Sequence, residues 1–185
     1  MVKNSTYDYQ CFLTGDPEGL SRIIRDHKDG LILYLNGIVQ NLSAAEDLTE
    51  ETFVKLIVKR PRFSADSSFK TWLYTIGRYL ALSYLRRNRN AQIPLENCPE
   101  LKDEESDLQQ RYIRHEEQRA VHQAMQKLKK EYRQVLWLIY FEGFTHKETA
   151  RILGKTVHNT ETLAYRARQA LKDKLLQEGY MYENL

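Results

Sequence analysis

The side chains best suited to bind a ligand lie between residues 144 and 171, where polar and basic residues recur at helical spacing. A helical pattern begins near residue 157, and one side of it carries His158, Asn159, Thr162, Arg166 and Arg168. Guanidinium groups bind phosphates, whereas imidazole, amide and hydroxyl groups can form hydrogen bonds with base edges. This combination predicts that the segment binds duplex DNA.

Two short helices around a tight turn would position these side chains. Thr145 and Glu148 have the spacing of a capping box, which starts a first helix. Gly154 follows the apolar residues of that helix and permits a left-handed helix end. Thr156 can cap a second helix, whose inward side is expected to carry Val157, Thr160, Ala164, Ala167 and Leu171. The pattern predicts a helix-turn-helix, with an ordinary helical hairpin as the alternative.

An enzymatic site is a competing hypothesis, because Gly154, Lys155 and Thr156 match the end of a phosphate-binding loop. The glycine required five residues before Gly154 is Thr149, and a helix rather than a strand is expected to precede the turn. The five histidines lack metal-ligand spacing, and no serine or cysteine lies in a nucleophile motif. The sequence therefore predicts no catalytic residue, no metal site and no cofactor.

Charge is distributed unevenly along the 185 residues, although the net charge is only +3. Residues 55–90 contain nine Lys or Arg and one acid, whereas residues 96–117 contain eight acids and three bases. A polyanion would bind the first block and be repelled by the second. The length suits one average domain or two small ones, and the division within the chain favours two.

The cysteine content and the hydropathy pattern bear on the compartment. Cys11 and Cys98 are too few and too far apart for a disulfide framework or a zinc knuckle. No stretch has the roughly 20 apolar residues that span a bilayer, and no charged-then-apolar leader opens the chain. We therefore expect a soluble cytoplasmic protein without membrane insertion.

Apolar residues in the first half recur at helical spacing, which predicts four helices within a domain spanning residues 8–90. Asp16 and Pro17 are expected to start the first helix, and a separate second helix carries apolar residues from 31 to 39. Ser43 and Glu46 form a candidate capping box for the third helix, which runs to about residue 59. The inward faces of the third and fourth helices are expected to carry Leu48, Phe53, Leu56 and Ile57, and Phe69, Trp72, Leu73, Ile76, Leu80 and Leu85, respectively.

The middle of the chain predicts a linker. Residues 91–110 are rich in acids and poor in apolar periodicity, which favours a solvated segment. A second helical domain is expected over residues 111–178, entered by a long helix that runs from about residue 108 through Val121, Met125 and Leu128. The predicted fold class is all-α, with two small helical domains joined by an acidic linker and a helix-turn-helix in the second.

Three segments in this order resemble bacterial sigma factors: AAEDLTEETFVKL at residues 44–56, FSADSSFKTWLYTIGRYLALSYLRR at residues 63–87, and the helix-turn-helix. Sigma factors of the extracytoplasmic-function (ECF) class keep only regions 2 and 4, joined by a short linker, and the layout of this chain is similar. The resemblance implies a subunit that directs core RNA polymerase to specific promoters and initiates DNA opening. Its implied partners are the clamp and flap of the core enzyme, and promoter DNA.

In sigma factors an acidic helix of region 2 docks on the coiled-coil clamp of the polymerase large subunit. The resemblance therefore implies a polymerase-binding set that comprises Asp47, Leu48, Glu50, Glu51 and Phe53. The local chemistry agrees, because Glu46 adds a fourth acid and no base lies between residues 41 and 54. The alternative is that these acids only favour the first turns of a helix through its dipole.

By resemblance, the loop at residues 62–68 and the helix after it recognise and open the minus-ten promoter element. Opening of the duplex unstacks a base, which then needs a pocket with an aromatic or apolar wall and hydrogen-bonding groups. Cationic side chains are needed to bind the phosphates. The implied contact residues are Phe63, Ser64, Ser67, Ser68, Lys70, Trp72, Arg78, Tyr79, Arg86 and Arg87. Trp72 has the spacing of a core residue and is expected to be chiefly structural, so the serines and Lys70 are the better candidates. Tyr79 departs from the family, which usually has Asn here, and the base preference is therefore left open.

The resemblance also implies that the helix-turn-helix reads the minus-thirty-five element. The implied contact residues are Lys147, Lys155, His158, Asn159, Glu161, Thr162, Leu163, Arg166 and Arg168, the Lys and Arg as phosphate anchors. Glu161 and Leu163 stand where the family commonly has basic residues, and an acid near phosphates costs affinity. One interpretation is therefore a weak upstream contact. The other is base readout, because Glu accepts a hydrogen bond from cytosine and an apolar side chain can touch a thymine methyl.

A free-standing helix-turn-helix regulator is the alternative function. Such a regulator would not need the acidic helix, and it would normally form a dimer on a palindromic site. No heptad or extra apolar face supplies a dimer interface. We therefore expect a monomer when free, whose two weak DNA contacts become strong when the polymerase holds them together. The resemblance further implies a dedicated anti-sigma factor that covers the binding faces.

Overall fold

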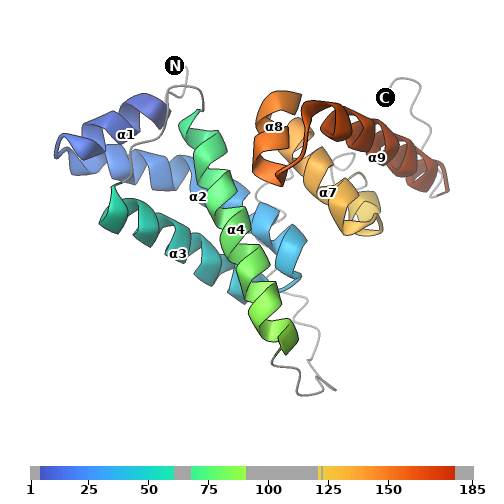
Figure 1. The fold of residues 1–185 in the computed structure, drawn as a ribbon, viewed down its shortest axis with the longest axis horizontal. Helices are drawn as coiled ribbons and strands as arrows, with labels where there is room; N and C mark the ends of the chain where they lie inside the picture. Colours follow the sequence, from blue (N-terminus) through green and yellow to red (C-terminus); the bar gives the residue numbers. More distant parts are fainter. Residues whose placement is uncertain (1–4, 61–67, 91–120, 122, 178–185) are drawn as a thin grey trace. The chain divides into compact units, whose positions relative to one another are not determined.

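The computed structural model describes residues 5–60, 68–90, 121 and 123–177. The chain divides into two compact units, Met1–Glu100 and Leu101–Leu185. Within the described residues every regular element is a helix, which confirms the all-α prediction (Figure 1). The first unit contains α1 (Ser5–Leu13), α2 (Pro17–Val39), α3 (Leu42–Lys59) and α4 (Phe69–Asn90). The second contains α7 (Lys130–Leu136), the π-helix η1 (Trp137–Phe141), α8 (His146–Leu153) and α9 (Val157–Gln177).

Helix α2 is continuous, so the prediction of two separate helices between residues 17 and 39 was wrong. Asp16 caps it as expected, because the Asp16 carboxylate accepts a hydrogen bond from the Glu18 N–H at 3.0 Å, and Pro17 is the first helical residue. The polar residues in the middle do not end the helix, since His27 and Gly30 lie on its buried side. The neighbouring helices therefore decide the continuity of α2.

Helix α1 was not predicted, and it packs along the first half of α2. Gly19 permits this approach, because a Cβ atom at this position would lie 2.3 Å from the Asp8 carbonyl oxygen. Two polar contacts join the helices: Arg22 Nε donates to Asp8 Oδ1 at 2.6 Å, and the Ser5 hydroxyl lies 2.7 Å from His27 Nε2. The contact depends on residues up to 22 positions apart, which local periodicity does not reveal.

Aromatic residues form much of the core of the first unit, where α4 packs against α1, α2 and α3. The rings of Tyr9 and Phe69 lie 4.9 Å apart, and those of Tyr34 and Tyr74 lie 5.4 Å apart. All four side chains are fully buried. This packing holds α4 against the other three helices, and it leaves one side of α4 exposed.

Helix α3 begins earlier than predicted, and its cap is a different residue. The Asn41 side-chain oxygen accepts a hydrogen bond from the Ala44 N–H at 2.9 Å, so Ser43 and Glu46 do not form the predicted capping box. Arg60, in the left-handed conformation, ends the helix. Leu48, Phe53 and Leu56 are buried as expected, whereas Ile57 is 38% exposed, contrary to prediction.

The long helix predicted to run through Leu128 ends two residues earlier, at Gln126. Residues 123–126 are helical, the chain turns at residues 127–129, and α7 begins at Lys130. The buried Arg133 side chain stabilises the turn, because its Nη1 donates to the backbone carbonyl and the side-chain oxygen of Gln126 at 3.3 and 3.0 Å. The start of the predicted helix, from residue 108 to residue 120, lies outside the described residues.

Candidate functional site

Helix α3 presents an acidic surface on its outer side. Glu46, Asp47 and Glu50 are exposed, and Glu51 is half-buried with its Oε1 3.1 Å from Lys55 Nζ. Since Lys55 neutralises part of the Glu51 charge, Glu46, Asp47 and Glu50 are better placed than Glu51 to meet a basic partner.

Two members of the predicted polymerase-binding set lie in the core instead. Leu48 is 4% exposed and Phe53 is 6% exposed. They pack α3 against the rest of the unit and so position the acidic side chains. Their own side chains are too buried to contact a partner.

The outer side of α3 changes from acidic to apolar toward its end, which the sequence reasoning missed. Val54, Ile57 and Val58 follow Glu50 at helical spacing, and Val58 is 74% exposed. Large apolar side chains that cluster on a surface often mark an interaction site. The sequence did contain a signal for this apolar surface. Val54 and Val58 follow Glu50 by one and two helical turns, so they lie on the same side of the helix.

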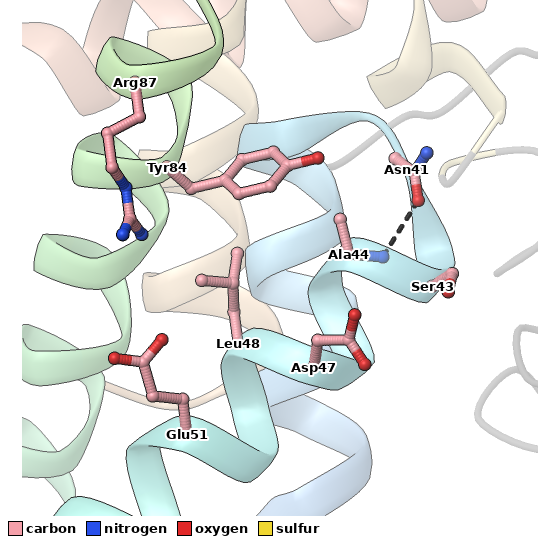
Figure 2. A pocket seen from close by; sticks show the side chains of 8 residues that line it. All are labelled: Asn41, Ser43, Ala44, Asp47, Leu48, Glu51, Tyr84 and Arg87. Carbon is pink, nitrogen blue, oxygen red and sulfur yellow. Dashed lines mark hydrogen bonds between the residues drawn. The ribbon is translucent and has the colours of Figure 1, made fainter.

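A groove with a volume of about 390 Å³ lies between α3 and α4 (Figure 2). Its lining residues are Asn41, Ser43, Ala44, Asp47, Leu48, Glu51, Tyr84 and Arg87. Arg87 was predicted to bind DNA, but it lines the same groove as Asp47 and Glu51. Figure 2 shows its side chain descending from α4 on the side of Glu51. Tyr84 was not among the predicted site residues.

The predicted minus-ten residues other than Arg87 separate into three groups. Phe63, Ser64 and Ser67 lie outside the described residues. Four others, Ser68, Lys70, Trp72 and Arg78, make contacts within the fold. The Ser68 hydroxyl accepts a hydrogen bond from the Thr71 N–H at 3.2 Å, Lys70 Nζ lies 5.7 Å from the centre of the Tyr74 ring, and the Trp72 ring lies 5.9 Å from that of Phe69. Trp72 is half-buried, as expected of a chiefly structural residue.

Arg78 is half-buried, so only part of its side chain is accessible at the surface. It lies close enough to Tyr34 to influence its ionisation. Burial raises the pKa of the Tyr34 hydroxyl far above its ordinary value, and the Arg78 charge lowers this pKa in part. Arg78 therefore belongs at least partly to the interior of the unit.

The third group lies on the exposed side of α4. Tyr79 and Arg86 are both exposed, seven residues apart on the same side of the helix, and Thr75 lies one turn before Tyr79. Tyr79 is 66% exposed. An exposed aromatic ring near cationic side chains can stack on an unpaired base while the cations bind phosphates.

The helix-turn-helix prediction is confirmed in its local geometry. The Glu148 N–H donates to Thr145 Oγ1 at 3.3 Å and the Thr145 N–H donates to Glu148 Oε2 at 3.0 Å, so the capping box is complete. Gly154 adopts the left-handed conformation with φ of +66°. The Asn159 N–H donates to Thr156 Oγ1 at 3.2 Å, which caps α9 as expected.

Helix α9 separates a buried side from an exposed side. Thr160, Ala164, Ala167 and Leu171 are buried as predicted, whereas Val157 is 41% exposed because it is the first residue of the helix. The predicted contact residues His158, Asn159, Glu161, Arg166 and Arg168 are exposed, and Thr162 and Leu163 are half-buried. Tyr165, 57% exposed, was missed, although it follows Glu161 by one helical turn.

The two predicted lysine anchors differ in their surroundings. Lys147 is exposed in the first turn of α8. Lys155, in the turn between α8 and α9, lies with its Nζ 3.6 Å from Glu131 Oε1 of α7. The charge of Lys155 is therefore partly compensated within the unit.

Two protein-family models match the chain in the order of its two units. Sigma-70 region 2 matches residues 23–91, and Sigma-70 region 4 matches residues 118–171. Together they cover more than half of the chain. The chain belongs to the sigma-70 family.

Relatives of this sigma factor include RNA polymerase sigma factor YlaC of Bacillus subtilis, 29% identical over 160 residues, which cover 85% of this chain and 92% of YlaC. The ECF RNA polymerase sigma factor SigX of the same organism is 25% identical over 162 residues, which cover 84% of this chain and 83% of SigX. The sigma factor RpoE of Bartonella quintana, solved in complex with the anti-sigma factor NepR, has a similar fold, with a TM-score of 0.62 at 21% identity, over 84% of this chain and 95% of RpoE. The protein is an RNA polymerase sigma factor of the ECF class.

The family matches assign the surfaces of this sigma factor to its regions. The region 2 match includes α3 and α4, and therefore the acidic surface and the groove. The region 4 match includes α8 and α9 as far as Leu171, and therefore the helix-turn-helix. None of the described helices is both long and apolar enough to cross a bilayer.

Proposed function

We propose that this sigma factor binds core RNA polymerase through α3 and promoter DNA through α4 and α9, and that it selects promoters without catalysing a reaction. The observation that carries the proposal is the contrast between two surfaces on one chain. Region 2 presents exposed acids on α3, and region 4 presents polar and basic residues on α9. The first surface repels DNA and suits a basic protein, whereas the second suits DNA.

The polymerase contact is made by Asp47 and Glu50, with Val54 and Val58 extending it. The partner is the coiled-coil clamp of the large subunit, which the family resemblance names. Exposed acids would steer the encounter, and the apolar side chains would supply burial in the complex. Leu48 and Phe53 hold α3 in place by packing in the core of the unit.

The minus-ten contact involves the exposed side of α4. Tyr79 supplies a stacking surface for an unstacked base, and Arg86 binds the phosphates beside it. Ser68 and Trp72 hold the start of α4 in position. Phe63, Ser64 and Ser67 remain candidates for the base pocket by resemblance.

The minus-thirty-five contact is made by α9, which enters the major groove as the second helix of the helix-turn-helix. His158, Asn159 and Thr162 read base edges, and Lys147, Arg166 and Arg168 bind phosphates. The polymerase holds both DNA contacts at once, so two weak contacts give strong promoter binding.

The chain acts as a monomer in the cytoplasm and is controlled by an anti-sigma factor. Support comes from RpoE of Bartonella quintana, solved with the anti-sigma factor NepR. An inhibitor that covers the α3 surface would compete directly with the polymerase.

The test is run-off transcription from a genomic promoter library with purified core polymerase, with and without the protein. New discrete start sites that share two spaced elements are expected. Binding to core without transcripts would contradict promoter selection, and the absence of both would favour the free-standing regulator.

The docking face is tested by Glu50→Lys, with Asp29→Lys as the matched control. Both residues are exposed acids within helices of the first unit. Glu50→Lys should weaken core binding by about tenfold or more, because a buried like-charge contact replaces a favourable one. Asp29→Lys should leave it unchanged. Equal retention of the two variants on core enzyme would show that the docking face lies elsewhere.

A further inference from the structure

Two buried polar groups without hydrogen-bond partners lie between α2 and α4. The Tyr34 side chain of α2 is buried together with its hydroxyl, and Arg78 of α4 has a buried Nε atom. Among the residues that the structure describes, neither the hydroxyl nor this Nε atom forms a hydrogen bond. A buried polar group without a partner is unfavourable, so each of the two groups would gain stability by acquiring one.

Arg78 is the cation next to the Tyr34 hydroxyl. Burial raises the pKa of this hydroxyl, and the charge of Arg78 offsets part of the effect, so the two groups are near each other without the geometry of a hydrogen bond. The surrounding packing is tight. The rings of Tyr34 and Tyr74 lie 5.4 Å apart, and a Cβ atom at Gly77 would lie 3.1 Å from Leu31 Cδ1. The backbone of α4 is therefore held against α2 at the residue before Arg78.

The outer end of the Arg78 side chain is placed to meet an anion. The residue is half-buried, and of its three side-chain nitrogen atoms only Nε is buried without a partner. Thr75, which is exposed, precedes Arg78 by about one helical turn, and the exposed Tyr79 follows it directly. Arg78 therefore lies at the edge of the exposed side of α4, beside the ring proposed to stack on an unpaired base.

We propose that Tyr34 is a positioning residue for promoter opening, whose hydroxyl accepts a hydrogen bond from the Nε–H of Arg78 and so directs the two Nη groups to a backbone phosphate of the unpaired DNA strand. This inference rests on the proposed function, and it adds to the minus-ten contact a residue of α2 that touches no DNA. A guanidinium group has five N–H donors in a fixed plane, so it can bind the hydroxyl and the phosphate at the same time. The bond to Tyr34 gives both buried groups a partner when DNA fixes the Arg78 side chain.

A purely structural role for Tyr34 makes a different prediction. Its hydroxyl forms no hydrogen bond in the free protein, so Tyr34→Phe should leave the stability of the free protein unchanged. A side chain that only fills the core would then have no effect on DNA either. A positioning role requires that the hydroxyl matters when DNA is bound, and only while Arg78 is present.

The experiment measures promoter opening by the holoenzyme, with permanganate footprinting at a promoter identified with the wild-type protein. The variants are Tyr34→Phe, Arg78→Gln and the double variant. Tyr9→Phe is the matched control, because Tyr9 is also a fully buried tyrosine of the first unit, and the cation that affects its ionisation is Arg60. Urea unfolding of each free protein and the salt dependence of holoenzyme binding to the promoter are measured alongside.

Tyr34→Phe should lower the equilibrium constant of promoter opening by about tenfold at an unchanged urea midpoint, because a hydrogen bond to a charged group is lost. Tyr9→Phe should open the promoter normally. Arg78→Gln should reduce opening at least as much as Tyr34→Phe, and it should lower the salt slope by about one, because one phosphate contact is lost. In the Arg78→Gln background Tyr34→Phe should have no further effect, since the hydroxyl acts through the guanidinium group.

Three results would overturn the inference. One is normal opening by Tyr34→Phe, and another is a double variant whose loss is the sum of the two single losses, which would mean that Tyr34 acts independently of Arg78. The third is a urea midpoint that falls in Tyr34→Phe but not in Tyr9→Phe, which would assign the hydroxyl to the stability of the free protein. In all three cases the wild-type holoenzyme still opens the promoter. If it opens none, the proposed function fails as well, so the two failures are distinguishable.

Discussion

The ammonium group of Lys155 lies 3.6 Å from the Glu131 carboxylate, which joins the turn of the helix-turn-helix to the first turn of α7. Lys155 is also a predicted phosphate anchor, so one side chain has two possible partners. DNA binding and the internal ion pair therefore compete for the same charge.

Glu131→Gln tests this competition. The variant should lose less than about 1 kcal/mol of unfolding free energy, because the pair is partly exposed. It should bind promoter DNA more tightly by a few-fold at low salt, since Lys155 no longer has a compensating charge. Titration at two salt concentrations measures the effect, and an unchanged affinity at low salt would mean that Lys155 does not contact phosphate.

Gly19→Ala should strongly destabilise the first unit. The added Cβ would meet the Asp8 carbonyl oxygen at 2.3 Å and the Phe12 nitrogen at 2.9 Å, both backbone atoms of α1. Such overpacking costs about 1–3 kcal/mol or displaces the helix. Gly37→Ala is the control in the same helix, because nothing lies within 4 Å of its Cβ. It should stabilise the unit by about 0.5–1 kcal/mol, and urea unfolding that ranked the two variants in the opposite order would contradict the packing of α1.

Thr145→Ala should cost about 1 kcal/mol by removing the side-chain cap of α8. Thr145→Ser keeps the hydroxyl and should retain most of the stability. Trp137 lies in the second unit, as Thr145 does, and Trp72 lies in the first. Tryptophan fluorescence in a Trp72→Phe background therefore reports unfolding of the second unit. Equal stability of the Ala and Ser variants would show that the capping box contributes nothing.

Gly154→Ala tests the turn itself. The φ of +66° is unfavourable for a residue with a Cβ, and no atom lies within 4 Å of the position, so the expected loss of about 1–2 kcal/mol is purely conformational. Gly154→Asn should lose less, because Asn tolerates this region better. The same fluorescence assay measures both, and an Asn variant less stable than the Ala variant would contradict the conformational origin.

Tyr79→Ala should leave stability within about 0.5 kcal/mol, because the side chain is mostly exposed. Promoter opening should nevertheless fall several-fold if the ring stacks on an unpaired base, since stacking contributes about 1–3 kcal/mol per base. Permanganate footprinting of unpaired thymines with the holoenzyme measures the opening. Tyr79→Phe keeps the ring and should open the promoter normally, and equal opening by the Ala variant would remove Tyr79 from the melting surface.

The sequence predicted features whose determinants lie within a few residues of each other. The Thr145 and Glu148 capping box, the left-handed Gly154 and the Thr156 cap were all predicted correctly. Each depends on hydrogen bonds or backbone angles within about one helical turn, which residue types alone specify. The family could also be inferred, because three motifs in order are more specific than one.

Predictions that depended on neighbouring elements were less successful. The helix predicted to run through Leu128 ends at Gln126, where the Arg133 side chain binds the chain. The Ser43 and Glu46 capping box was also wrong, although it is a local pattern, because Asn41 caps α3 instead. Leu48 and Phe53 are buried as their spacing predicted, although the family resemblance also placed them in the polymerase-binding set. Ile57 was predicted to be buried and is 38% exposed. Helical periodicity identifies the apolar side of a helix, but not how much of that side another helix covers.

The sequence by itself determined the helical class, the helix-turn-helix and the sigma-70 family, because local spacing and motif order encode them. Only the tertiary structure decided that α1 packs on Gly19, that α2 is continuous, and that Arg87 lines a groove with Asp47 and Glu51. Those outcomes depend on side chains from helices far apart in the sequence, whose mutual packing selects among conformations that local preferences leave nearly equal in free energy.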